Sequence, residues 1–113
     1  MGIAWGNDKF VAVGDNGKMA YSSDGQNWTA VGDSKFGTFL IRGITWGSNK
    51  FFAVGSSGKK AYSSDGISWT AVEDSIYVGN GIAWGNNKFV AVGSQGRMAY
   101  SPDGINWTAV TNF

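Results

Sequence analysis

The chain has 113 residues, which fits a single domain, and it contains no Cys, which excludes disulfides, thiolate metal sites and thiol catalysis. Nine Lys plus Arg stand against eight Asp plus Glu with no His, and this net charge of +1 is not the basic surface that nucleic acid or an anionic membrane attracts. No apolar run approaches the roughly 20 residues that span a bilayer, and the start of the chain lacks a signal-peptide pattern.

Residues 2–31 predict four short β-strands. Glycine occurs 18 times and aromatic residues make up 15% of the chain, a composition typical of short strands and tight turns. Strands are expected at residues 3–5, 10–13, 18–22 and 28–31. Turns rich in Gly, Asn and Asp separate them, and the Asn-Gly and Asp-Gly pairs supply the positive φ angles that hairpins need. Four strands joined by three short hairpins form an antiparallel meander.

This unit occurs three times, at residues 2–31, 43–72 and 81–110. Without a gap, the first and third units share 24 of 30 positions, and the first and second share 21. Successive units start 41 and 38 residues apart, which is the length of a β-propeller blade. The sequence therefore predicts an all-β propeller fragment, a single domain over residues 1–113, with four-stranded antiparallel blades at approximately 2–31, 39–72 and 77–110.

The second strand of each unit indicates how the blades pack. Residues 10–13, Phe-Val-Ala-Val, are apolar on both faces instead of alternating with polar residues. An antiparallel strand of this kind is covered on both sides. A blade sandwiched between two neighbours has this requirement, whereas a two-layer sandwich leaves one face polar.

The third hairpin of each unit carries the motif Ser-x-Asp-Gly-x-x-Trp, at residues 22–28, 63–69 and 101–107. The motif resembles the Asp-box of sialidase-like, BNR-type propellers, Ser-x-Asp-x-Gly-x-x-Trp, and is one residue shorter between Asp and Trp. The surrounding pattern is similar to repeats of large bacterial and phage-associated propellers. The resemblance implies a structural turn, in which the aspartates accept hydrogen bonds from their own hairpin and the tryptophans pack in the core. These residues are Asp24, Trp28, Asp65, Trp69, Asp103 and Trp107.

Three blades are too few to close a propeller, which typically needs four to eight. Each end blade is expected to expose an apolar face, and such a face favours association. Heterologous contacts between copies close a ring when the rotation permits, so we expect a homo-oligomer: a six-bladed dimer first, a nine-bladed trimer second. The chain ends near a blade boundary, where Phe113 is expected to align with Phe36. The alternative is a fragment of a longer propeller protein.

The residue types argue against an enzyme. Without His and Cys, the commonest bases, nucleophiles and transition-metal ligands are missing. A sialidase-like site would need an arginine cluster, yet Arg42 and Arg97 occupy non-equivalent positions and Glu73 is the single glutamate. The turns lack the carboxylate density of a calcium loop. We therefore expect no catalytic residue, no metal and no cofactor.

Binding is the better hypothesis. The turns between second and third strands and the linkers between units are expected at one end of the blades, and the linkers diverge most between repeats. Exposed aromatic and polar side chains at this end would suit sugar rings. The candidate ligand-binding residues are Lys18, Phe39, Arg42, Lys59, Tyr77 and Arg97, with Lys60 and Ile76 on the same face. The alternative is that the aromatic residues seal the blade interface and the cations are ordinary surface charges.

The tryptophans of the first strands, Trp5, Trp46 and Trp84, also allow two interpretations, as walls of sugar pockets between blades or as core residues wedged there. Two functions follow. The first is a multivalent, carbohydrate-binding, lectin-like module. The second is a structural, engineered or reconstructed repeat scaffold without a ligand, which the near-identity of the repeats favours. In neither function is a nucleic acid or a membrane expected as a partner.

Overall fold

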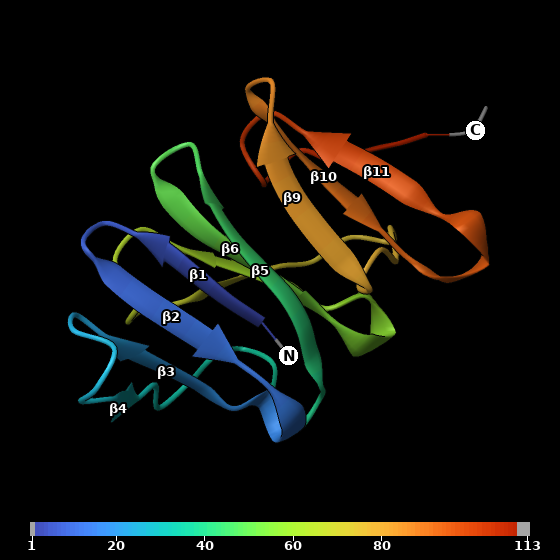
Figure 1. The fold of residues 1–113 in the computed structure, drawn as a ribbon. Helices are drawn as coiled ribbons and strands as arrows, with labels where there is room; N and C mark the ends of the chain where they lie inside the picture. The colour runs from blue at the N-terminus through green and yellow to red at the C-terminus, as the bar shows by residue number, and fades with distance from the viewer. Residues whose placement is uncertain (1, 111–113) are drawn as a thin grey trace.

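The computed structural model describes residues 2–110, which form three four-stranded antiparallel sheets, each a meander in which consecutive strands pair (Figure 1). The first sheet contains β1 (Gly2–Gly6), β2 (Lys9–Val13), β3 (Met19–Ser22) and β4 (Thr29–Ala30). The second contains β5 (Ile41–Gly47), β6 (Lys50–Gly55), β7 (Lys60–Ser63) and β8 (Thr70–Val72). The third contains β9 (Gly81–Gly85), β10 (Lys88–Val92), β11 (Met98–Ser101) and β12 (Thr108–Ala109). The expected alignment of Phe113 with Phe36 lies outside the described residues.

The turns between the strands follow from their residue types. Between β1 and β2, Asn7 and Asp8 both have positive φ, 47° and 59°, which is the two-residue hairpin that matches the twist of the strands. Between β2 and β3, Asp15–Gly17 form one 3₁₀ turn in which Asn16 has φ 57°. Both turns recur in the second and third sheets. The predicted four-strand order is confirmed.

The fourth strand begins one residue later than predicted, at Thr29 instead of Trp28. The indole N–H of Trp28 donates a hydrogen bond to the carbonyl oxygen of Gly25 at 3.1 Å, so this tryptophan belongs to the turn. The same bond joins Trp69 to Gly66 at 3.1 Å and Trp107 to Gly104 at 2.7 Å. The motif tryptophan therefore closes its hairpin before the strand starts.

The three sheets stack side by side, the second between the first and the third (Figure 1). We call the side that carries the first-strand tryptophan the front face of a blade; in the second blade it includes Ile44, Trp46, Phe51, Ala53 and Trp69. The opposite side is the back face; in the first blade it includes Ala4, Val11, Val13, Met19 and Tyr21. These two sets form one core, and the front of the third blade packs on the back of the second in the same way.

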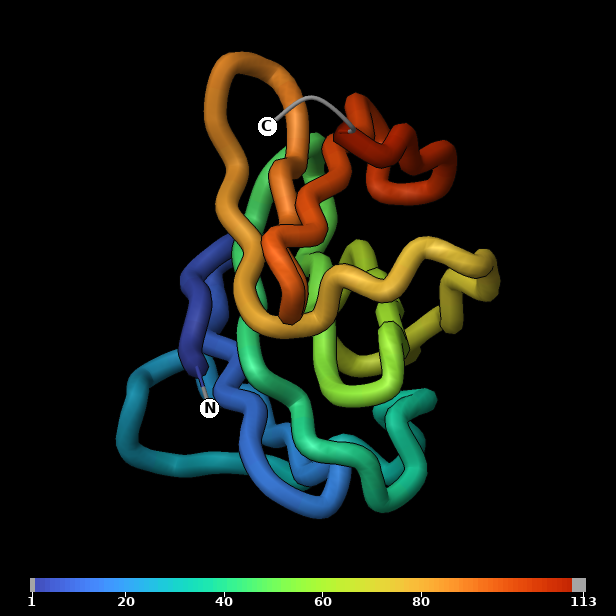
Figure 2. Tube along the Cα trace, turned by 90° about the vertical axis from the view of Figure 1, so that its right-hand side faces the viewer, coloured from blue at the N-terminus to red at the C-terminus, as the bar shows by residue number. Residues whose placement is uncertain are grey.

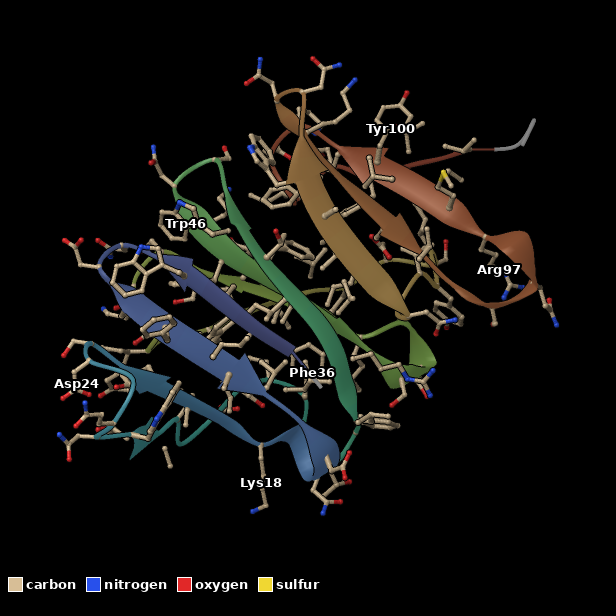
Figure 3. All side chains as sticks on the ribbon, viewed as in Figure 1. Lys18, Asp24, Phe36, Trp46, Arg97 and Tyr100 are labelled. Carbon is tan, nitrogen blue, oxygen red and sulfur yellow. The ribbon has the colours of Figure 1, made fainter. Side chains whose placement is uncertain are left out.

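The linkers complete these cores. Phe36, from the linker after β4, is 1% exposed and lies between the first and second sheets, where Figure 3 labels it. Val78, from the linker after β8, is also 1% exposed and packs against Ala91 and Ala99 of the third sheet. As predicted for a blade with neighbours on both sides, Phe51–Gly55 of the middle sheet are all buried.

The two outer faces are less covered. On the front face of the first blade, Trp5 is 51% exposed and Trp28 is 40% exposed, so the expectation that all three motif tryptophans are core residues is wrong for Trp28. Its equivalent Trp69 is 5% exposed because the first blade lies in front of it. Of the two interpretations of the first-strand tryptophans, wedging between blades describes Trp46 and Trp84, which lie against Gly6 and Gly47 of the preceding blade.

The Asp-box hairpins hold the ends of the blades through one carboxylate each. In the second blade, Oδ1 of Asp65 accepts backbone hydrogen bonds from Ile67 at 2.8 Å and Ser68 at 3.0 Å and one from the Ser63 hydroxyl at 2.9 Å. The first and third hairpins repeat this arrangement. Backbone N–H donors hold the pKa of Asp24 well below the usual value and lower the pKa of Asp65. The N–H groups of Asn106 and Ile105 lower the pKa of Asp103 to about 2.

Replacing an Asp-box aspartate should destabilise the fold. Asp65→Ala leaves two backbone N–H groups and a hydroxyl without their acceptor, so we expect the free energy of unfolding to fall by about 1–3 kcal/mol in urea titrations. Asp15→Ser is the control, because serine already occupies the equivalent positions 56 and 94. Equal stabilities for the two variants would contradict a structural role for the carboxylate.

The same carboxylates should make stability depend on acid pH. The pKa of each is lower in the folded chain than the value of about 3.9 in an unfolded one, so their contribution is fully present above about pH 5. It is lost as the pH falls through 4 toward 2. We expect the urea midpoint to be flat near neutrality and to fall over that acid range. A midpoint that stays constant down to pH 2 would exclude this linkage.

Candidate functional site

The candidate site lies at the end of the blades where the linkers and the 3₁₀ turns meet. In a meander the second and fourth strands finish at the same end, so each linker passes the turn of its neighbour. Backbone hydrogen bonds fix this meeting: the N–H of Ile41 donates to Gly14 at 3.0 Å, and that of Ser56 donates to Leu40 at 2.9 Å. Figure 2 shows the second linker, residues 73–80, crossing from the second sheet to the third at this end (yellow to orange).

A groove of about 340 Å³ opens between the second and third blades at this end. Three of the six predicted binding residues, Arg42, Tyr77 and Arg97, line it together. Arg42 comes from β5, Tyr77 from the second linker and Arg97 from the turn before β11. The remaining wall is formed by glycines and small polar residues, namely Gly55, Ser56, Ser57, Gly58, Gly79, Asn80 and Ser94.

Tyr77 is held in place although its ring is 55% exposed. One side of the ring lies against Gly58, which has φ 71° and whose missing side chain leaves the space that the ring occupies. Elsewhere in the lining, Nη1 of Arg42 donates to Oδ1 of Asn80 at 3.0 Å. The groove therefore presents an aromatic surface beside fixed hydrogen-bond donors.

Lys60 anchors the linker that carries Tyr77. Its Nζ donates to Oδ1 of Asp74 and to the carbonyl oxygen of Ile76, each at 2.7 Å, and the whole residue is 2% exposed. The expectation that Lys60 lies on the binding face is therefore wrong, because its stem is in the core and its ammonium group is enclosed by linker oxygens. The equivalent positions are Met19, which is buried, and Met98, which is half-buried, and this alignment with apolar residues was the signal of burial.

The other three predicted binding residues lie elsewhere. Phe39 and Lys59 form a pair, with Nζ of Lys59 4.9 Å from the ring centroid, and Lys59 lines a second groove on the other side of Tyr77. Lys18 lies in the first blade beside the first linker. Figure 3 shows Lys18 and Arg97 far apart on the first and third sheets. The six residues thus form one cluster of three, one pair and one isolated cation.

The groove is lined mainly by hydrogen-bonding groups and one aromatic ring. Its wall contains two guanidinium groups, one phenol, one amide and several hydroxyls, and no carboxylate. Within residues 2–110 there is no group of three or more His, Cys, Asp or Glu that could hold a metal ion. Over the same range, no helix has the length and apolar character needed to cross a membrane. Asn80 and the serines of the turns were not predicted, since small polar loop residues carry no distinctive sequence signal.

The fold is similar to that of known protein structures. No family model matches the chain, and no curated protein matches it. A solved structure described as YCF48 bound to D1 peptide matches 96% of this chain with a TM-score of 0.77 and 22% identity. Another, YCF48 from Cyanidioschyzon merolae, matches 100% of the chain with a TM-score of 0.77 and 20% identity. The fold is that of a β-propeller segment. The chain spans 40% and 37% of the lengths of these two proteins.

Removing the buried ammonium should loosen the linker without unfolding the blade. In Lys60→Met the new side chain is the one found at both equivalent positions and keeps the core filled. We therefore expect the free energy of unfolding to fall only by about 1–3 kcal/mol, the cost of leaving Asp74 and the carbonyl of Ile76 without their donor. Amides of residues 73–80 should exchange with deuterium faster, because Asp74 and Ile76 lose their common donor. Lys59→Met is the control. Unchanged exchange in the linker would show that Lys60 does not position Tyr77.

Proposed function

We propose that this chain is a non-enzymatic binding module and that its ligand is a carbohydrate held in the groove of Arg42, Tyr77 and Arg97. The observation that carries the proposal is the convergence of these three side chains in a groove without a carboxylate. A sugar has apolar ring faces that stack on an exposed aromatic ring and hydroxyl edges that suit hydrogen-bond donors. The structure described as YCF48 bound to D1 peptide supports the use of this fold in binding.

We also propose that copies of the chain complete a propeller ring. The support is the pair of uncovered faces on the outer blades, which carry exposed Ile3, Trp5 and Trp28 at one end and Val92 and Tyr100 at the other. The similar YCF48 fold has seven blades. Neighbouring blades are rotated by about 51° in a ring of seven blades, about 60° in a ring of six and about 40° in a ring of nine. Starting from the seven-bladed angle, a six-bladed ring of two chains requires a smaller change than a nine-bladed ring of three.

The ring would make the module multivalent. The arginine pair with Tyr77 occurs once in the described chain, at the junction of the second and third blades. A ring of two chains then carries two identical grooves on one face. Weak binding at each groove would be strengthened by avidity when the ligand presents repeated sugars.

The mass in solution and a glycan array test the proposal. We expect a mass of about 24 kDa, twice the 12.0 kDa of one chain, and binding of one ligand per chain. Tyr77→Ala and Arg97→Ser should each weaken binding at least about tenfold in calorimetric titrations, because each removes one wall of the groove.

Lys18→Ser is the matched control, since Lys18 is a cation of the same end of the molecule but lies outside the groove. Equal loss of affinity in the control would indicate general electrostatic attraction. A chain that assembles but binds no glycan would replace the lectin-like proposal with the scaffold without a ligand.

A further inference from the structure

The junction between blades is built twice inside this chain, and each copy uses the same knob and socket. Trp46 of the second blade lies over Gly6 of the first, and Trp84 of the third lies over Gly47 of the second. Both glycines are buried, and a side chain at either one would overlap the indole. The tryptophan is the knob of the front face, and the glycine is the socket of the back face.

One knob and one socket of the same kind are left over. Trp5, the knob of the first blade, is 51% exposed. Gly85, the socket of the third blade, is exposed, and a Cβ built on it meets no atom within 4 Å. The sequence around the two is identical, because residues 2–6 and 81–85 both read Gly-Ile-Ala-Trp-Gly.

The rim of each junction carries a second repeated contact. Nζ of Lys9 donates to the carbonyl oxygen of Asp65 at 2.7 Å, and Nζ of Lys50 donates to that of Asp103 at 2.7 Å. Each bond ties the first hairpin of one blade to the Asp-box of the next. Lys88 has the equivalent position in the third blade and lies 5.8 Å from the ring of Tyr100, much as Lys50 lies 5.3 Å from that of Tyr62.

The Asp-box glycines follow the same pattern. A Cβ on Gly66 would lie 2.9 Å from Val11 of the preceding blade, and one on Gly104 would lie 2.8 Å from Phe52. Gly25, in the first blade, has only Phe10 of its own blade nearby, at 3.6 Å. The front half of a junction is therefore present on the first blade, and the back half is present on the third.

We propose that two copies of this chain associate head to tail, with the front face of the first blade of one copy on the back face of the third blade of the other. Trp5 then fills the socket over Gly85, and Lys88 donates to the backbone carbonyl of Asp24. This contact assumes that the ring of the proposed function forms. It adds which face of one copy meets which face of the next, and through which residues. Faces of these two kinds already pack against each other inside the chain, at both of its internal junctions. The surface that fits each uncovered face is therefore the opposite face of a second copy.

The alternative of front against front is disfavoured by shape. It would bring Trp5 of one copy to Trp5 of the other, with no glycine socket on either side. A heterologous contact also repeats, so each copy uses both of its faces, and the ring closes where the rotation between blades permits. A front-to-front contact would stop at two chains and leave both back faces uncovered.

Blocking each half of the contact separately tests the polarity. Trp5→Arg places a charge on the front face, and Gly85→Arg fills the socket of the back face. Both positions are exposed, and Gly85 does not need a positive φ, so both variants should fold as the parent does. Each variant alone should have the mass of one chain. Mixed together, they should form a one-to-one heterodimer through the single intact pair of faces.

Gly32→Arg makes the same substitution at an open position of the first linker and should leave the mass of the parent unchanged. A Gly85→Arg variant that keeps the parent's oligomeric mass would overturn the head-to-tail contact through Gly85, although copies of the chain would still associate. A mixture that stays monomeric would overturn it too. A parent chain of 12.0 kDa in solution would overturn both the ring and this contact.

Discussion

The contact between a tryptophan of one first strand and a glycine of the preceding one sets the spacing of the whole molecule. Trp46 over Gly6 and Trp84 over Gly47 allow β1, β5 and β9 to approach closely, because the space that a side chain would fill is taken by an indole. The fourth strands β4, β8 and β12 lie at the opposite edge of each sheet, at a distance from this seam. A linker must cross this distance to return from each outer strand to the next inner one, so the grooves arise there.

A repeated sequence does not produce repeated environments when the repeats are few. Trp28 and Trp69 occupy the same position in the same motif and make the same bond to their own glycine, yet they are 40% and 5% exposed. The difference is due to the blade in front, which the first unit lacks within this chain. Burial in a propeller is thus a property of a pair of blades, while hydrogen bonding in the hairpin is a property of one blade.

This distinction explains how far the sequence could predict the structure. The meander and its turns depend on contacts within about thirty residues. The sequence predicts their strand ends to within one residue in the first unit. The grouping of Arg42, Tyr77 and Arg97 depends on where the second linker runs between β5 and the turn before β11. No local sequence pattern specifies that path. Lys60 was misplaced because a charge normally indicates the surface, and its oxygen partners, from Asp74 and Ile76, lie in a linker outside the repeated unit.

The exchange of methionine for lysine at position 60 shows how a site can arise on a repeated framework. The side chains of Met19 and Met98 are apolar, whereas Lys60 adds an ammonium group that needs oxygen partners and finds them in the linker beside it. This linker places Tyr77 against Gly58 and next to the two arginines. Together with Arg42 of β5 and Arg97 of the turn before β11, this linker gives the junction of the second and third blades a groove with a positioned aromatic ring. The hairpins of the framework stay constant, while the chemistry of the groove comes from the linker, from Arg42 of β5 and from Arg97 of the turn before β11.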